Sequence, residues 1–429
     1  MAGQLACENK KNEGYSTTKC LLLGMGVIQS IEQRSLQMGE EYKLPVFYFL
    51  VLGAFAGWQS YYNLHLDGIG FSSMQIGILN AVFIFTSALV VPFWGMLADK
   101  YGGYRILLLL SSVCALMVLL IGETFKFHWM LMLIAVVSVF HQPSGAVVDG
   151  ITVGFVRANP RFSYGQFRLW TSVGYASISL IVGYLARQGT DIIFKVSAGL
   201  FLLLSLINLF TLPGKPMTGR GLVTFRSFGI FFKNYRMLFF LLLIFLLGIA
   251  VAPLMQFINL YYNDIGANAS FIGWVFFLQA IPEIPAYIVG VRIVKRIGAE
   301  NMILLSMVIS MLRLVFYGFI TTPEVAIFFS IFHCITVAFF LLGVVEYVQA
   351  RTPDHLQSTG QALIWAFHYG AGISVGNIIL GYLRDATGML KAMHIHALLA
   401  LLVLVLTVLL FRTKKEQIYP EISSEIPRS

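Results

Sequence analysis

The chain has 429 residues, of which 58% are hydrophobic and 11% are charged, and its mean hydropathy is +0.80. Soluble domains are less apolar and more highly charged, so this composition excludes a soluble protein and fits a polytopic helical membrane protein. The apolar runs are continuous rather than alternating, which excludes a transmembrane β-barrel. The net charge of +9 does not indicate nucleic-acid binding, because the basic residues cluster at the ends of apolar spans.

Residues 1–43 are predicted to form a cytoplasmic N-terminal extension. They are polar apart from the run CLLLGMGVI, which is too short to cross a bilayer and has no small-residue cleavage site after it. Met38 is followed by the short polar stretch GEEYK and then by the first long apolar span, so translation is expected to start either at Met1 or at Met38. We expect some or all of residues 1–37 to be dispensable for folding.

Twelve apolar stretches follow, each of about twenty residues, the length that a bilayer demands of a helix. The first six lie near 44–66, 73–98, 104–122, 128–155, 164–187 and 191–212. The last six lie near 237–262, 270–292, 301–320, 324–350, 356–384 and 390–411. The predicted organisation is therefore an N-terminal six-helix half (44–212), a linker (213–236), a C-terminal six-helix half (237–411) and a tail (412–429).

The linker between the halves is basic and contains no acidic residue; its charged residues are Lys215, Arg220, Arg226, Lys233 and Arg236. Further basic residues fall at span ends on the same side, and the opposite loops are short and carry acidic residues. This asymmetry is the positive-inside pattern, which predicts that the linker and both termini are cytoplasmic. We expect a multi-pass protein of the cytoplasmic (inner) cell membrane of a bacterium.

An internal repeat relates the two halves at an offset of 195 or 196 residues. Ile69-Gly70 recurs as Ile265-Gly266, and GQFRLW from position 165 recurs as GQALIW from position 360. Gly95 likewise recurs as Gly290. Parallel repeats of this kind are typical of secondary transporters, in which the solute site lies between the halves near the bilayer midplane.

Specific motifs resemble the major facilitator superfamily. The segment GMLADKYGGYR resembles the superfamily's loop motif between the second and third helices, and its gating or structural residues are Gly95, Asp99, Lys100 and Arg105. YGQFRLWTSVGY resembles the fifth helix of the lactose permease, phenylpropionate permease and nucleoside symporter group. KRIGAENMILLSMVISMLR, and His333 with the FFLLG that follows, resemble the lactose permease. The resemblance implies the major facilitator fold, and Asp99 is expected to cap a neighbouring helix.

The span 164–184 carries a single arginine, Arg168, which costs a few kcal/mol in hydrocarbon unless it faces a partner or water. Arg168 and Tyr175 share one helix face, two turns or roughly 10 Å apart. Asp149 lies at a similar depth on the preceding span, and we predict that it pairs with Arg168. The resemblance implies that Arg168 and Tyr175 contact the solute; snorkelling of Arg168 to the cytoplasmic edge is the alternative.

Counting from the loops places Glu283 and Arg313 near the midplane on antiparallel neighbours, so an ion pair between them is feasible. His333 reaches a similar depth. Glu283 stands between two prolines, and broken helices at the midplane recur at transporter binding sites. The resemblance implies that Arg313 and His333 belong to a proton-coupling network.

Two positions depart from the lactose permease pattern. The family's proton-carrying glutamate is Thr336 here, and its sugar-binding carboxylate on the eighth helix has no aligned partner, since Glu283 stands about one turn away. We therefore expect Glu283 to carry the proton and also to contact the solute, because burial at the midplane favours a protonated carboxyl. Glu346 is the second choice for the proton carrier, or else a cytoplasmic gate residue or a solvated helix end.

The sequence thus predicts a transporter that imports a small polar organic solute with protons by alternating access. A sugar or oligosaccharide is the favoured solute; an aromatic carboxylate or a nucleoside is the alternative, and a drug:proton antiporter fits less well. A non-transporting membrane sensor is the competing class, but the loops are too small for a signalling domain. No motif indicates an enzyme, a metal site, a cofactor or a nucleic-acid partner. The solute, protons and the lipid bilayer are the expected partners, and a monomer is expected.

Overall fold

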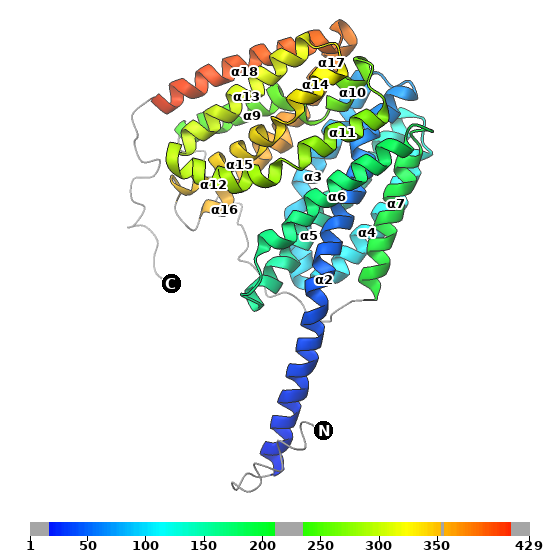
Figure 1. The fold of residues 1–429 in the computed structure, drawn as a ribbon, viewed down its shortest axis with the longest axis vertical. Helices are drawn as coiled ribbons and strands as arrows, with labels where there is room; N and C mark the ends of the chain where they lie inside the picture. The colour runs from blue at the N-terminus through cyan, green and yellow to red at the C-terminus, as the bar shows by residue number, and fades with distance from the viewer. Residues whose placement is uncertain (1–16, 211–234, 353–355, 413–429) are drawn as a thin grey trace.

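The computed structural model describes residues 17–210, 235–352 and 356–412, and over these ranges the chain is helical with no strand (Figure 1). The N-terminal half consists of α2 (Thr17–Gly68), α3 (Ser73–Tyr101), α4 (Gly103–Gly122), α5 (Phe127–Ala158), α6 (Tyr164–Leu185) and α7 (Ile192–Leu209). The C-terminal half begins with α9 (Tyr235–Met255), α10 (Ile258–Asp264), α11 (Ala269–Ala280), α12 (Glu283–Ile297) and α13 (Ala299–Phe319). It continues with α14 (Pro323–Ser330), α15 (His333–Gln349), α16 (Gln357–Trp365), the π-helix η2 (Ala366–Gly372), α17 (Ile373–Thr387) and α18 (Met389–Arg412).

The predicted fold class is confirmed. Among the described residues, 11 helical rods are long and apolar enough to cross a membrane. The twelfth predicted span is α6, which has 22 residues and a single charged side chain. It is long enough to cross a membrane but more polar than the other eleven spans. The most polar of the twelve spans is therefore the one that carries Arg168.

The two halves differ in the continuity of their helices. Each span of the N-terminal half is one uninterrupted helix, although α3 and α5 contain the internal prolines Pro92 and Pro143. Four spans of the C-terminal half are broken or distorted: between α9 and α10, between α11 and α12, between α14 and α15, and at η2. The second segments of two of these spans begin at Glu283 and at His333.

Two pairs of glycines make the internal repeat visible in the backbone. Gly70 and Gly266 have φ angles of 91° and 93°, and Gly102 and Gly298 have φ angles of 96° and 85°. Residues other than glycine rarely adopt these positive φ angles, so the two glycine pairs form equivalent turns in the two halves. The sequence repeat therefore corresponds to a structural repeat.

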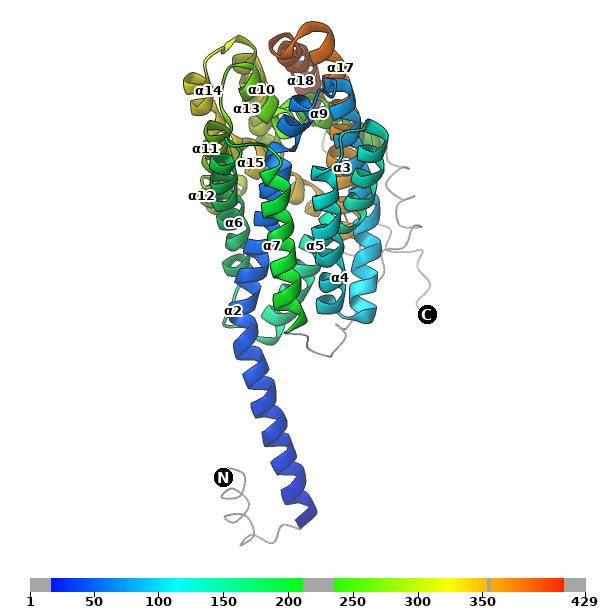
Figure 2. The ribbon, with the colours of Figure 1, turned by 90° about the vertical axis from the view of Figure 1, so that its right-hand side faces the viewer.

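Two crossed helix pairs join the halves. α3 packs along α17 and η2, and α6 packs along α11, as Figure 2 shows for the labelled helices. Gly77 of α3 faces the backbone of Asn377, and Gly273 of α11 faces the backbone at Ser179 and Leu180 of α6. Small residues at both crossings let the backbones approach closely.

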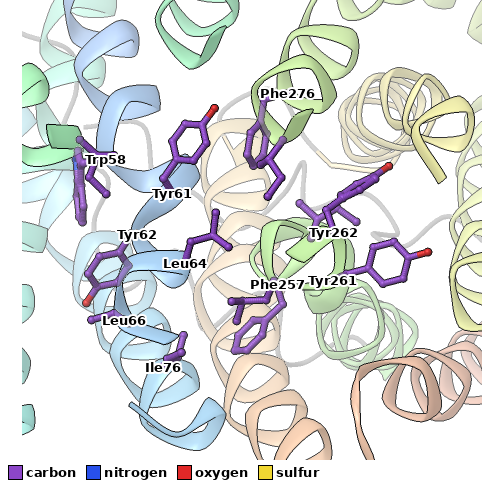
Figure 3. Close-up of a cluster of buried hydrophobic side chains, with 14 of the residues drawn as sticks. Trp58, Tyr61, Tyr62, Leu64, Leu66, Ile76, Phe257, Tyr261, Tyr262 and Phe276 are labelled. Carbon is purple, nitrogen blue, oxygen red and sulfur yellow. The ribbon is translucent and has the colours of Figure 1, made fainter. Parts of the chain in front are cut away.

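An aromatic cluster fills the space where α2 meets α10 and α11 (Figure 3). Trp58, Tyr61 and Tyr62 of α2 are buried there, and the ring of Tyr61 lies edge-on to Phe276 of α11 at 6.2 Å. Tyr261 and Tyr262 of α10 continue the cluster on the other side. Buried aromatic area of this kind makes the contact between the halves firm at this level.

A charged cluster closes the same end of the molecule, and we call it the latch: Asp67, Ser73, Asp264, Arg384 and Asp385. The guanidinium of Arg384 donates to both carboxylate oxygens of Asp264 at 2.6 and 2.9 Å, to Asp67 at 2.8 Å and to Ser73 at 2.8 Å. Asp385 accepts from two backbone N–H groups at the start of α3, each at 2.9 Å. The latch therefore ties α2 and α3 to α10 and α17.

The opposite end, which we call the linker side, is where α7 ends and α9 begins. Ion pairs there join residues of the same half: Glu41 with Arg161, and Glu300 with Arg351. The hydrogen bonds found between the halves within the described ranges involve residues toward the latch side, such as Asn63 with Gln256 at 2.6 Å. The structure is therefore closed on the latch side.

Several expectations fall on residues outside the described ranges. These are the linker apart from its last two residues, the tail after Arg412 and residues 1–16 of the extension. From Thr17 onward the extension is continuous with α2, which projects beyond the bundle (Figure 1). The dispensability of residues 1–37, the start site and the domain boundaries stay predictions.

Candidate functional site

The predicted ion pair between α5 and α6 is confirmed. Nη1 of Arg168 donates to both carboxylate oxygens of Asp149, at 2.8 and 3.0 Å. The hydroxyls of Tyr48 and Tyr164 donate to the same carboxylate at 2.7 and 2.8 Å. The side chains of Arg168 and Asp149 are 47% and 33% exposed, so the pair keeps donor and acceptor capacity for a further group.

The position of α6 is set by its packing on α2. A side chain at Gly174 would meet the backbone of Phe49, so glycine permits the close approach of the two helices. This approach places Tyr175 against α2, where its hydroxyl lies 3.2 Å from that of Ser60. The ring of Tyr175 also lies 6.2 Å from Phe276 of α11, so it stands at the junction of the halves.

Two helix breaks bring Glu283 and His333 together. Pro282 precedes Glu283 at the start of α12, and α15 begins at His333. The carboxylate Oε1 of Glu283 lies 3.8 Å from Nε2 of His333, and the two side chains are 24% and 15% exposed. A first-turn carboxylate is favoured by the free N–H groups of its helix. The predicted break at the prolines is thus confirmed, and it sets the place of Glu283.

Arg313 lies deeper, behind His333. Its residue is only 1% exposed, and its Nη1 donates to the hydroxyl of Thr336 at 3.0 Å and lies 3.4 Å from Nδ1 of His333. Because arginine only donates, Nδ1 of His333 accepts, and the ring proton sits on Nε2, toward Glu283. The feasible ion pair between Glu283 and Arg313 is not formed, because the imidazole stands between them.

The two halves face one another across this site. Tyr175 lies within electrostatic range of Glu283, and Tyr287 of α12 lies within electrostatic range of both Glu283 and Arg168. Tyr369 of η2 adds a third hydroxyl near Glu283 and Tyr287. The predicted residues therefore form two groups, one in each half: Asp149 and Arg168 on α5 and α6, and Glu283, Arg313 and His333 on α12, α13 and α15.

Four tyrosines of this site were missed by the sequence analysis: Tyr48, Tyr164, Tyr287 and Tyr369. Tyr164 and Tyr287 had a usable signal, since each lies four residues from a predicted site residue, Arg168 or Glu283, on the same helix face. Tyr48 and Tyr369 come from helices with no predicted site residue. The π-helical geometry that presents Tyr369 has no signature in the sequence, although such bulges often mark functional sites.

The remaining predicted residues lie elsewhere. Glu346 is exposed on α15 and forms none of the ion pairs that join described residues, so it stands apart from Glu283 and His333. Gly95, Asp99 and Lys100 lie near the end of α3, and Arg105 lies in the first turn of α4. Over the described ranges Asp99 caps no helix, and the C-cap of α3 is Gly102 with its left-handed φ. No cluster of potential metal ligands occurs in those ranges.

Comparisons with known proteins agree on the family. The sequence model described as the MFS_1 like family matches residues 42–414. The maltose permease of Geobacillus stearothermophilus is 24% identical over 346 residues, which cover 80% of this chain and 87% of that protein. The probable 3-phenylpropionic acid transporter of Escherichia coli (strain K12) is 24% identical over 356 residues, covering 80% and 91%. The crystal structure of the nucleoside transporter NupG superposes with a TM-score of 0.78 at 17% identity, covering 88% of this chain and 100% of that chain, which shows a common fold.

Proposed function

Because the chain belongs to the MFS_1 like family of major facilitator transporters, we propose that it moves a small polar organic solute together with protons by alternating access. One observation carries this proposal: the N-terminal half holds a partly exposed ion pair on α5 and α6, and the C-terminal half holds a glutamate–histidine pair at two helix breaks. Solute and proton sites at the junction of two repeats are the arrangement that rocking-type transport requires.

The conformation supports an inward-facing state. The basic linker assigns the linker side to the cytoplasm by the positive-inside rule, and the latch then closes the outer side. In this orientation the protein lies in the inner membrane with both termini in the cytoplasm. It works as a monomer, since the site is assembled from the two halves of one chain.

The N-terminal half supplies the solute contacts. Asp149 and Arg168 neutralise each other and still present acceptors and donors, which suits hydroxyl groups. Tyr175 offers an aromatic face between the halves. Tyr48 and Tyr164 orient the carboxylate of Asp149 and act as positioning residues.

The C-terminal half supplies the proton site. Glu283 takes up and releases the proton, and the Nε2–H of His333 points toward it because Arg313 occupies the other ring nitrogen. Protonation of Glu283 removes a partly buried negative charge and thereby changes which conformation the halves prefer. Glu346 is exposed, and we assign it no part in proton transfer.

The names of similar proteins indicate three solute classes to test: a sugar (the maltose permease), an aromatic acid (the 3-phenylpropionic acid transporter) and a nucleoside (the nucleoside transporter NupG). The hydroxyl-binding character of the Asp149–Arg168 pair is compatible with the sugar that the sequence favours. It is equally compatible with other hydroxylated solutes. The Asp149–Arg168 pair does not indicate whether the solute is charged; the charged residues of the C-terminal half bear on that question.

The test is proton uptake by proteoliposomes challenged in turn with maltose, 3-phenylpropionate and uridine. We expect one class to alkalinise the bulk solution, and we expect a protonophore to abolish the signal. Glu283→Gln abolishes solute-driven proton uptake, whereas the matched exposed variant Glu346→Gln retains it. Solute counterflow without proton movement in the wild-type protein would show a uniporter or exchanger and would refute the proposal.

A further inference from the structure

Arg313 is a buried cation without a directly paired anion. No carboxylate among the described residues lies at ion-pair distance from it, and its partners Thr336 and His333 are neutral. Its Nε and Nη2 atoms are buried and find no hydrogen-bond partner in the described ranges. A buried guanidinium is costly unless a negative charge compensates it.

Glu283 offers such a negative charge on the far side of the His333 ring. The two contacts in this line measure 3.4 Å from Arg313 Nη1 to Nδ1, and 3.8 Å from Nε2 to Glu283 Oε1. An ionised Glu283 therefore balances Arg313 through a single intervening ring. A protonated Glu283 leaves Arg313 uncompensated.

The sum of the charges in the whole site also shows that protonation of Glu283 leaves one positive charge uncompensated. Asp149 and Arg168 cancel each other by their direct contact, and His333 is neutral in the tautomer that Arg313 imposes. The site is thus neutral when Glu283 is ionised and carries one positive charge when Glu283 is protonated.

We propose that the transported solute is a monocarboxylate, which replaces ionised Glu283 as the counter-charge of Arg313 when Glu283 takes up the proton. This inference rests on the proposed proton symport and adds the charge of the solute. The proton binds to the Glu283 carboxylate from one side of the membrane and leaves it on the other. One negative charge and one proton cross together, so each cycle is electrically neutral.

The surroundings of Glu283 suit a second carboxylate. The Nε2–H of His333 on α15 and the hydroxyls of Tyr287 on α12 and Tyr369 on η2 are hydrogen-bond donors near Glu283. Tyr175 on α6 lies at the junction with the other half, where its ring is 6.2 Å from Phe276. Tyr317 on Arg313's own helix has its ring 5.6 Å from the guanidinium. None of these groups supplies a negative charge.

The electrical test uses proteoliposomes with protein-free vesicles as the background. The probes are 3-phenylpropionate, lactate and gluconate, the primary amide of each, and the neutral solutes maltose and uridine. Uptake is measured with a pH gradient at zero voltage, and with an inside-negative voltage without a pH gradient. We expect a carboxylate to accumulate with the pH gradient, its amide not to be transported, and voltage alone to drive no accumulation.

A set of variants isolates the charge of Arg313. Glu283→Gln mimics the protonated carboxyl, and we expect it to exchange the carboxylate across the membrane without accumulating it. Adding Arg313→Gln to this variant reduces exchange by roughly tenfold or more, the effect of one charge at short range in a protein interior. Arg313→Lys in the same background recovers part of the exchange. Monodispersity of each variant in gel filtration shows that it is folded.

The outcomes separate this inference from the proposed function. Proton-driven accumulation of maltose or uridine, or equal transport of a carboxylate and its amide, overturns the monocarboxylate inference and leaves proton symport intact. Transport that ignores the pH gradient overturns the proposed function as well. Voltage-driven accumulation of a carboxylate also contradicts the inference, because it requires a net charge in the loaded site.

Discussion

The two halves of this protein build their parts of the site by different means. In the N-terminal half, Asp149 and Arg168 project from unbroken helices and hold each other in place by a direct ion pair. In the C-terminal half, Glu283 and His333 each stand at the first residue of a helix segment after a break. An intact helix gives a fixed polar surface, whereas a break frees backbone groups near the midplane and holds a carboxylate that changes its charge.

The two halves also differ in how their buried and partly buried charges are compensated. The N-terminal pair is neutral in itself and partly exposed, which suits a binding surface that stays the same through the cycle. Arg313 of the C-terminal half has its compensating charge beyond a ring, so its environment changes whenever Glu283 takes up a proton. The asymmetry between the halves is therefore an asymmetry between solute recognition and proton coupling.

Making the helix continuous before Glu283 should have the largest effect on the difference between the halves. The double variant Pro282→Ala, Pro285→Ala restores two backbone N–H donors, so α11 can continue into α12 and move the Glu283 carboxylate away from His333. We expect solute-driven proton uptake to fall by roughly tenfold or more, as when a reacting group is misplaced by about 1 Å. The control is Pro143→Ala in unbroken α5, and equal rates in both variants would contradict the account.

Opening the latch should have the next largest effect. Arg384→Ala leaves the carboxylates of Asp67 and Asp264 without their shared cation. We expect the free-energy difference between the two conformations to shift by about 1–3 kcal/mol in favour of the outward-open one, while the solute-binding residues are unchanged. Electron–electron distances between spin labels at the exposed positions Gln188 and Thr387 report the opening; a distance distribution identical to wild type would show that the latch does not hold the halves.

Two glycines separate the interface between halves from packing within a half. Gly77→Leu pushes α3 against the backbone of Asn377 in the other half, and Gly174→Leu pushes α6 against Phe49 in its own half. Overpacking costs about 1–3 kcal/mol in each case. We expect Gly77→Leu to shift the spin-label distance and Gly174→Leu to lower the melting temperature instead. The reverse pattern would show that the contact at Gly77 does not change when the halves move.

The smallest effect is expected at the exposed pair of Asp191 and Lys195 on the latch side. The hydrogen bond from Lys195 lowers the pKa of Asp191, so the pair contributes at neutral pH and is lost as the pH falls through that lowered pKa. Both side chains are more than half exposed, so solvent screens the interaction. Asp191→Asn should leave the melting temperature at pH 7 and the spin-label distance unchanged, and a shift in either would show that any charge on this side affects the latch.

The fold could be predicted because span lengths, the repeat and the basic linker can each be recognised from the residue types in short stretches of the sequence. The sequence also predicted the pair of Asp149 and Arg168, since both depths can be counted from nearby loop residues. Counting gives the depth of a residue and not its direction around the helix, which is why an ion pair between Glu283 and Arg313 was considered feasible although His333 stands between them. Tyr369 was beyond reach for a related reason, because a π-helical turn rotates every residue after it.

The latch was equally hidden. The charge asymmetry shows only that the short loops opposite the linker carry acidic residues, and Arg384 lies more than a hundred residues beyond Asp67 and Asp264. Their meeting depends on how the halves rock together, which is a property of one conformation. Sequence patterning records the helices, whereas contacts between halves need the tertiary structure.

The most direct measurement of the central claim compares Glu283→Gln with Asp149→Asn in proteoliposomes. Solute exchange and uphill uptake are followed in both variants with the solute identified by proton uptake. The account predicts that Glu283→Gln exchanges the solute without accumulating it, and that Asp149→Asn loses both activities. Uphill uptake at the wild-type level in Glu283→Gln, or undiminished exchange in Asp149→Asn, would contradict the division of the site into a solute-binding half and a proton-coupling half.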